Sequence, residues 1–262
     1  MFKNRLVERA LYPVMHRVRA VDLFGVSVEL SEQINDIQRE SDDLLKRIPR
    51  FQSSLASEMQ KLVLDMKIDT TFCSMVLSIC DHIAGIKSGF KRENCRATVH
   101  VEGFLFSGQL IQLVEYVSGD GRVYAGKSAG RTFSVRRGII GRVWRSQLPE
   151  IKGVLETGFD INSDEATRQI AQMWGLTRPE AVHVKKYPSY MAIPINYAND
   201  KIAVFYMDST DEDAFPLEEE QEFCGFINKT FRKNGLLSAI SQLDARLSVP
   251  NKIDPLEVIE NG

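Results

Sequence analysis

The 262-residue sequence has few of the residues that build metal or redox centres. It contains four cysteines and four histidines, and no two cysteines have the spacing of a zinc knuckle or a redox pair. The histidines are scattered and form no H-E-x-x-H motif. We therefore predict no bound metal, and the sequence indicates no particular cofactor. We interpret Cys73 and Cys80, seven residues apart, as buried thiols of a reducing compartment.

Long apolar runs and an excess of one charge are also missing. No run approaches the roughly 18–20 residues that a membrane-spanning helix needs, and charged residues interrupt the apolar N-terminus, unlike in a signal peptide. Lys and Arg number 33 against 35 Asp and Glu, a net charge of −2 that argues against a general nucleic-acid-binding protein. We predict a cytoplasmic protein that binds no nucleic acid.

The N-terminal part is an extension over residues 1–64, with a basic amphipathic segment, a short strand or extended connector over 21–30, and a helical heptad-like region. Residues 1–20 form a short basic amphipathic segment, for which we favour docking on the protein itself over contact with a membrane surface or a partner. Farther on, apolar residues recur at steps of three and four, with Ser41 at the missing step, at Ile34, Ile37, Leu44, Ile48, Phe51 and Leu55. This stripe covers either its own domain or a second subunit. We favour a homodimer formed by the stripe together with a helix over 217–243.

Periodicity predicts an α+β domain over residues 65–247, followed by a loose tail over 248–262. Helical periodicity covers residues 53–89, 138–145 and 217–243, and residues 165–174 favour a helix. Strands are predicted over residues 95–102, 109–117, 122–124, 131–135, 190–197 and 201–208. The expected fold is an antiparallel sheet of about six strands flanked by helices.

Residues 121–128 match the phosphate-binding pattern G-x-x-x-x-G-K-[ST], which would assign nucleotide hydrolysis to Lys127 and Ser128. That chemistry needs a parallel strand before the loop and a helix after it. Here Gly130 and β-branched residues follow, which favour a turn and a strand. We retain a nucleotide hydrolase as an alternative and favour tight turns at these glycines.

Two segments resemble a known family. Residues 133–144 (FSVRRGIIGRVW) are similar to the middle of GAF domains, where a strand leads into a short helix containing G-x-x-G. Residues 190–195 (YMAIPI) and 201–209 (KIAVFYMDS), with the helix after them, resemble the closing hairpin and terminal helix of that family. The resemblance covers about residues 65–242. It implies a regulatory sensor fold with helices on one face of the sheet and a ligand pocket on the other.

The chain departs from two GAF subfamilies. The Asn-Lys…Phe-x-x-x-Asp-Glu pattern of the phosphodiesterase kind is missing, because Phe205 and Asp208 are one step too close. No Cys-His pair for covalent bilin attachment occurs either. The resemblance therefore leaves the ligand open.

Candidate binding residues gather around the start of the 138–145 helix. Arg136 and Arg137 precede Gly138, where unpaired backbone N–H groups and arginine side chains favour a phosphate or carboxylate; an exposed charged surface is the alternative. The remaining predicted ligand-binding residues are Tyr116, Phe133, Ile139, Trp144, Trp174 and Tyr190. Core packing is the alternative for each aromatic residue. No catalytic arrangement is recognisable.

These features predict a non-enzymatic GAF-like module. It would bind a small molecule, such as a nucleotide or another anionic ligand, and signal through dimerisation or an output partner protein. The alternatives are the nucleotide hydrolase and a structural dimerisation scaffold without a ligand.

Overall fold

A computed structural model describes residues 54, 56–103, 108–124, 126, 128–152, 159–197, 200–216 and 220–247. The basic segment 1–20, the strand or connector over 21–30, the apolar stripe over 34–55 and the tail 248–262 lie outside the described residues, so the predictions made for them stand as predictions. The predicted domain boundaries also stay predictions. Among the described residues, none of the helices has the length and apolar content needed to cross a bilayer.

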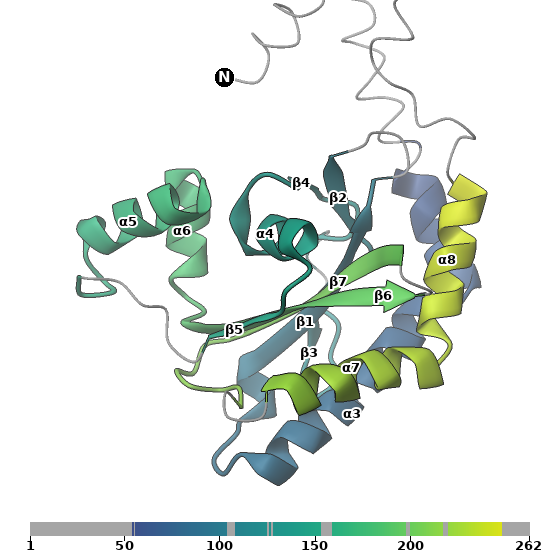
Figure 1. Cartoon of the computed structure of the whole chain (residues 1–262), viewed down its shortest axis with the longest axis horizontal. Helices are drawn as coiled ribbons and strands as arrows, with labels where there is room; N and C mark the ends of the chain where they lie inside the picture. Colours follow the sequence, from purple (N-terminus) through teal and green to yellow (C-terminus); the bar gives the residue numbers. More distant parts are fainter. Residues whose placement is uncertain are drawn as a thin grey trace, which may run out of the picture. The chain divides into compact units, whose positions relative to one another are not determined.

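The core of the fold is a seven-stranded antiparallel sheet (Figure 1). Along the sheet the strands lie in the order β4-β2-β1-β7-β6-β5, and β3 pairs with β1. The strands are β1 (Cys95–Glu102), β2 (Gln109–Gln112), β3 (Val117–Ser118), β4 (Thr132–Ser134), β5 (Glu150–Lys152), β6 (Ser189–Tyr197) and β7 (Asp200–Ser209). The predicted α+β class with helices flanking an antiparallel sheet is confirmed.

The two central pairings set which side chains share a face. Strand β7 pairs with β1 with Val99 opposite Phe205, and with β6 with Ile193 opposite Phe205. Because side chains alternate between faces, every second residue of these strands points to the same side. The β6–β7 hairpin is the one that the sequence predicts. Strand β6 begins one residue earlier than predicted, and β7 is one residue longer at each end.

Helices α3 (Ile68–Ile86), α7 (Glu220–Lys233) and α8 (Leu236–Leu247) cover one face of the sheet. Figure 1 shows them together on the side away from α4. The Phe205 ring from β7 lies 6.2 Å from that of Phe72 on α3 and 5.8 Å from that of Phe231 on α7, measured between centroids. All three side chains are fully buried, so this face is a conventional apolar core.

Two long predicted helices are each broken. The helix predicted over 53–89 is interrupted at Met66 and Lys67, and Lys67 adopts a left-handed conformation with φ of 54°. The helix predicted over 217–243 divides into α7 and α8 at Gly235, which has φ of 72°. Glycine ends a helix readily at such a position because it has no Cβ to clash.

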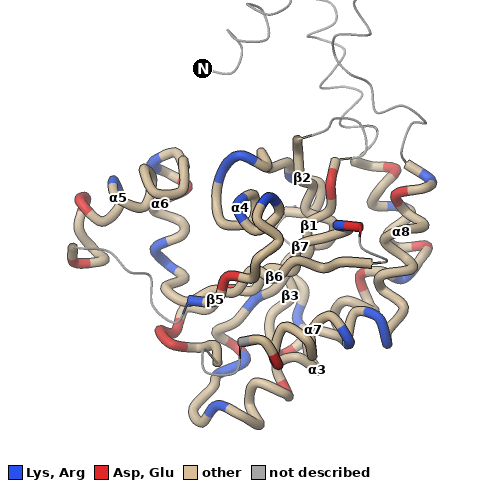
Figure 2. The backbone as a smooth tube through the Cα atoms, in the orientation of Figure 1, with Lys and Arg blue, Asp and Glu red and all other residues tan. Residues whose placement is uncertain are grey.

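The opposite face of the sheet is covered by α4 (Gly138–Ser146) and approached by α5 (Asp164–Trp174) and α6 (Arg178–Val184) (Figure 1). The sequence predicted α4 and α5 but neither α6 nor β5. A capping interaction begins α6, in which the Thr177 backbone N–H donates to the Glu180 carboxylate at 2.6 Å. Figure 2 shows residues of both signs interspersed along the described chain, as the near-neutral net charge leads one to expect.

Candidate functional site

The two faces of the sheet differ in chemistry. Toward α3, strand β1 presents Ala97 and Val99, whereas toward α4 it presents Arg96, Thr98 and His100. We call this second surface, which is covered by α4 and approached by α5 and α6, the α4 face. It continues on β7 with Val204, Tyr206 and Asp208, and on β6 with Tyr190 and Ala192. It combines buried polar groups with aromatic and aliphatic side chains.

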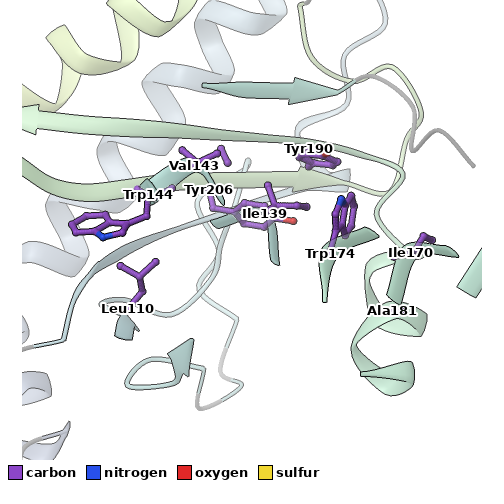
Figure 3. Packing of buried hydrophobic residues seen from close by; sticks show 11 residues of the cluster. Leu110, Ile139, Val143, Trp144, Ile170, Trp174, Ala181, Tyr190 and Tyr206 are labelled. Atoms are coloured by element: carbon purple, nitrogen blue, oxygen red, sulfur yellow. The ribbon is translucent and has the colours of Figure 1, made fainter. Parts of the chain in front are cut away.

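A cluster of buried aromatic and aliphatic side chains lies on the α4 face, and we call it the aromatic cluster (Figure 3). Its buried members include Ile139 and Trp144 from α4, Trp174 from α5, and Tyr190 from β6. The indole of Trp174 meets the Tyr190 ring edge to face at 5.6 Å between centroids. Tyr116 and Phe133 are partly buried and pack against the cluster. The structure thus brings six of the nine predicted ligand-binding residues together.

The other three predicted residues lie at the start of α4. Arg136 is exposed. The Nε atom of Arg137 donates to the Gly175 carbonyl oxygen at 2.6 Å, and its Nη2 lies 3.2 Å from the Glu180 carboxylate. Arg137 therefore ties the start of α4 to the α5–α6 connection. Gly138 has φ of 69°, a conformation that glycine adopts without strain. Anion binding here stays a prediction.

A second group on this face is centred on Arg96, whose guanidinium is largely buried. Its Nε and Nη2 atoms donate to the two carboxylate oxygens of Asp208 at 2.8 and 3.1 Å. The guanidinium also stacks between the rings of Tyr116, at 4.2 Å, and Tyr187, at 3.7 Å. Nη2 lies 3.2 Å from Nε2 of His183 on α6. Arg96 thus joins the sheet to α6 and to the loop before β3.

Burial raises the pKa of the Asp208 carboxyl, although the hydrogen bonds and charge of Arg96 oppose that shift. Burial lowers the pKa of Arg96, but the hydrogen bonds and charge of Asp208 outweigh burial and raise that pKa overall. Burial, reinforced by the charge of Asp208, raises the pKa of Tyr206 well above its ordinary value. The Tyr206 hydroxyl therefore stays protonated and hydrogen bonds to Asp208. Tyr206 is itself a member of the aromatic cluster, so its hydroxyl connects that cluster to the ion pair.

Strands β1 and β2 contribute polar atoms that have no hydrogen-bond partner among the residues that the structure describes. His100 is fully buried, and neither of its ring nitrogens makes a hydrogen bond. Opposite it in the β1–β2 register lies Gln112, also fully buried, whose Oε1 atom is unpaired. The Nε1 atom of Trp174 is unpaired as well. Buried polar atoms are nearly always satisfied by protein, water or ligand, so these atoms keep hydrogen-bonding capacity that no described residue uses.

The side-chain amide of Gln112 is held in one orientation. Its Nε2 atom donates to the Val114 carbonyl oxygen and to Ser128 Oγ, both at 3.0 Å. Ser128 in turn donates its hydroxyl to Glu115, which also accepts the Ser128 backbone N–H at 2.8 Å. Exchanging the amide O and N atoms would place two acceptors together at Val114. The Oε1 atom therefore stays the unpaired one.

The structure contradicts the nucleotide-hydrolase alternative. Ser128 is buried within the Gln112–Glu115 network, and the next element is strand β4, not a helix. The preceding strand β3 pairs with β1 in the antiparallel sense. Lys127 lies outside the described residues. Without a parallel strand before the loop or a helix after it, residues 121–128 lack the frame that a phosphate-binding loop requires.

The prediction of two buried thiols is confirmed for Cys80 but is wrong for Cys73, which is only partly buried. Cys80 and Cys95 are buried, and burial raises the pKa of each to about 12, so neither is a thiolate at neutral pH. Over the described ranges, no three His, Cys, Asp or Glu residues are grouped to hold a metal ion. Neither observation indicates a catalytic centre on the α4 face.

Sequence reasoning missed the polar residues of the central strands. Arg96, His100 and Gln112 stood in predicted strands and attracted no functional interpretation. The signal was present in β1, where polar residues alternate with small and apolar ones over CRATVHVE. Such alternation ordinarily indicates a solvated strand face. In this fold α4 covers that face, and the polar residues are buried.

Comparisons with known proteins give likenesses of fold only. No family model matches the chain, and no curated protein matches it. A GAF domain from an Acinetobacter phosphoenolpyruvate-protein phosphotransferase is 12% identical with a TM-score of 0.44, over 74% of this chain and 95% of that one. The GAF-B domain of DevS from Mycobacterium smegmatis is 16% identical with a TM-score of 0.37, over 65% and 97%.

Enzymes also occur among the matching structures. The type II free methionine-R-sulfoxide reductase from Thermoplasma acidophilum is 10% identical with a TM-score of 0.37, over 70% of this chain and 98% of that one. Several other matches are GAF domains, the family that the sequence motifs resemble. The chain is thus similar to GAF domains. The confirmed fold class rests on the strand order and helical layers described above.

Proposed function

We propose that this protein is a non-enzymatic sensory or regulatory module that binds a small molecule on the α4 face of its sheet. The motifs that resemble GAF domains support the regulatory role, and the chemistry of the α4 face supports the ligand. Binding would be signalled through a homodimer or an output partner protein.

One observation carries the proposal. His100, Gln112 and Trp174 each bury a polar atom without a hydrogen-bond partner, and all three belong to elements of the α4 face. Leaving such an atom unpaired costs about 1–3 kcal/mol. A core built only for stability would place apolar residues there, as the α3 face does with Val99 and Phe205. The polar residues therefore favour a bound ligand over a ligand-free scaffold.

A thermal-shift measurement tests the proposal against its alternatives. The purified full-length chain is heated with separate sets of nucleotides, amino acids and neutral heterocyclic compounds. We expect at least one set to raise the melting temperature in a saturable way, because a ligand that binds only the folded state stabilises it. A melting temperature that no compound shifts would support the scaffold.

An assay for magnesium-dependent hydrolysis of ATP and GTP accompanies the screen. We expect no turnover. Turnover that is lost in Lys127→Ala would support the hydrolase and contradict the proposal.

A further inference from the structure

We propose that the ligand of the α4 face is an uncharged molecule carrying a cis-amide group, as in a lactam, whose adjacent N–H and C=O are bound by Gln112 and His100. This inference rests on the proposed function, because it names the chemical class of ligand for the same site. It is carried by two residues that the sequence did not identify as a site.

The two side chains with unpaired atoms are cross-strand neighbours on one face of the sheet. His100 and Gln112 are directly opposite in the antiparallel β1–β2 pair, and such pairs project from the same face with Cβ atoms about 4.5–5.5 Å apart. Both side chains are fully buried. The two residues have not bonded to each other, so each leaves hydrogen-bonding capacity for a third group.

The identity of these atoms defines what they can bind. Gln112 Oε1 is an acceptor, held as such because Nε2 is bonded to Val114 and Ser128, and it therefore needs a donor from the ligand. Neutral imidazole has one N–H donor and one acceptor nitrogen. A group with an N–H next to a C=O satisfies the amide oxygen of Gln112 and the N–H of His100 together.

Charge selects against an anionic ligand at this position. Burial lowers the pKa of His100 to about 3, so the imidazole carries no positive charge at neutral pH. The guanidinium of Arg96, four residues away on the same strand, is already paired with the carboxylate of Asp208. An anion would lose its hydration here without gaining a cationic partner. An uncharged amide loses less hydration and recovers its hydrogen bonds.

The surroundings of the pair are aromatic and apolar. The imidazole of His100 lies edge to face with Phe133, at 5.1 Å between centroids, and with Tyr206, at 6.4 Å. Leu110 of β2 is fully buried in the same cluster. Aromatic edges and aliphatic side chains are favourable neighbours for a planar ring. The hydrogen bonds to the ligand would come from His100 and Gln112.

Three probe compounds separate the contributions of donor, acceptor and charge. The first, 2-pyridone, is a planar neutral ring with adjacent N–H and C=O. The second, N-methyl-2-pyridone, keeps the carbonyl but has no N–H for Gln112. The third, benzoate, is a planar anion of similar size. Binding of each probe to the full-length protein is followed by NMR, using the His100 ring resonances.

We expect 2-pyridone to shift the His100 resonances in a saturable way. N-methyl-2-pyridone should bind about fivefold or more weakly, because one hydrogen bond is lost, and benzoate should not bind. His100→Phe and Gln112→Leu should each weaken 2-pyridone binding about fivefold or more. His82→Phe is the matched control, since His82 stacks on Phe226 of α7 on the other side of the sheet, and it should leave binding unchanged.

The outcomes separate the inference from the proposed function. Equal binding of 2-pyridone and its N-methyl derivative, or tighter binding of benzoate at the same resonances, would overturn the amide class and leave the proposed site standing. If no probe and no compound of the thermal-shift screen shifts the His100 resonances, both are overturned. A site occupied only by water, seen as unchanged resonances at saturating 2-pyridone, would also overturn the amide class.

Variant stability gives a second readout. Because its ring nitrogens are unpaired in the ligand-free protein, His100→Phe should melt at or above the temperature of the parent protein. Gln112→Leu also loses the two hydrogen bonds of Nε2 and should melt at a lower temperature. A large fall in melting temperature for His100→Phe would show that this side chain serves the fold, and would overturn the inference.

Discussion

The guanidinium of Arg96 and the carboxylate of Asp208 face each other with two hydrogen bonds, Nε to Oδ1 at 2.8 Å and Nη2 to Oδ2 at 3.1 Å. Arg96 is on β1 and Asp208 is its register partner on β7, so the ion pair lies across the central strands of the sheet. The Asp208 side chain is 2% exposed. Paired geometry of this kind is the condition under which buried charges are tolerated.

Replacing Arg96 by Met should lower the free energy of unfolding by about 3–5 kcal/mol, because it leaves a buried carboxylate without its partner. The double variant Arg96→Met, Asp208→Leu should be more stable than the single variant. Urea unfolding measures both. Arg178→Met removes the exposed pair with Asp164 and should leave the midpoint nearly unchanged. A double variant less stable than Arg96→Met would contradict this interpretation.

Replacing glycine by alanine should change the free energy of unfolding in opposite directions at two helical positions. A Cβ at Gly141 in α4 would lie 2.7 Å from the Val135 carbonyl oxygen, so Gly141→Ala must displace α4 from the chain around β4. A Cβ at Gly225 in α7 meets nothing within 4 Å. Gly225→Ala should raise the free energy of unfolding by about 0.5–1 kcal/mol, through helix propensity. Gly141→Ala should lower it, and an increase of similar size at both positions would refute the close approach.

Much of the fold follows from local patterns. Strand β1 and the β6–β7 hairpin were predicted nearly residue by residue, because apolar and β-branched residues alternate there between turn-forming residues. The helix breaks at Lys67 and Gly235 were missed, since the apolar period continues across both. The predicted strand over 109–117 is divided, and only its ends form β2 and β3. Such divisions depend on tertiary contacts.

The site was predicted less completely than the fold. The aromatic residues Trp144, Trp174 and Tyr190 stand out in a sequence because they are large and few. His100 and Gln112 do not, because their importance depends on burial and on lacking partners. Both properties arise only when α4 covers the sheet and β2 pairs beside β1. The sequence predicted the helix α4, but it shows neither that α4 covers this face of the sheet nor which residues of β1 and β2 lie opposite each other.

Acid should destabilise the protein through His100. Burial lowers the pKa of this residue to about 3 from an ordinary 6.5, so the unfolded chain takes up the proton first as the pH falls. The stability due to neutral His100 is complete above pH 6.5 and is lost as the pH falls toward about 3. The slope approaches about 1.4 kcal/mol per pH unit.

Urea unfolding from pH 7 to pH 4 measures that slope. In His100→Phe the free energy of unfolding should fall less steeply over this interval. The difference in slope should approach about 1.4 kcal/mol per pH unit, the contribution expected of His100. Parallel curves for the parent and the variant would show that His100 titrates normally in the folded protein.

Assembly is predicted from residues outside the described part of the chain. The stripe that includes Leu44 needs a partner surface, since each large apolar side chain that becomes fully buried stabilises the assembly by roughly 1.5–3 kcal/mol. Light scattering at micromolar concentration should give about twice the 29.7 kDa mass of one chain. Leu44→Asp should return the mass to that of one folded chain. A single-chain mass for the parent, with Leu44→Asp unfolded, would show that the stripe packs within one chain.

Ligand binding on the α4 face is tested most directly by tryptophan fluorescence. The chain contains two tryptophans, Trp144 and Trp174, and both are buried in the aromatic cluster of that face. A compound that raises the melting temperature should therefore change the emission in a saturable titration. The midpoint should agree with that of the thermal shift. A compound that stabilises the protein while leaving the emission unchanged would place the binding site elsewhere and contradict the proposed ligand face.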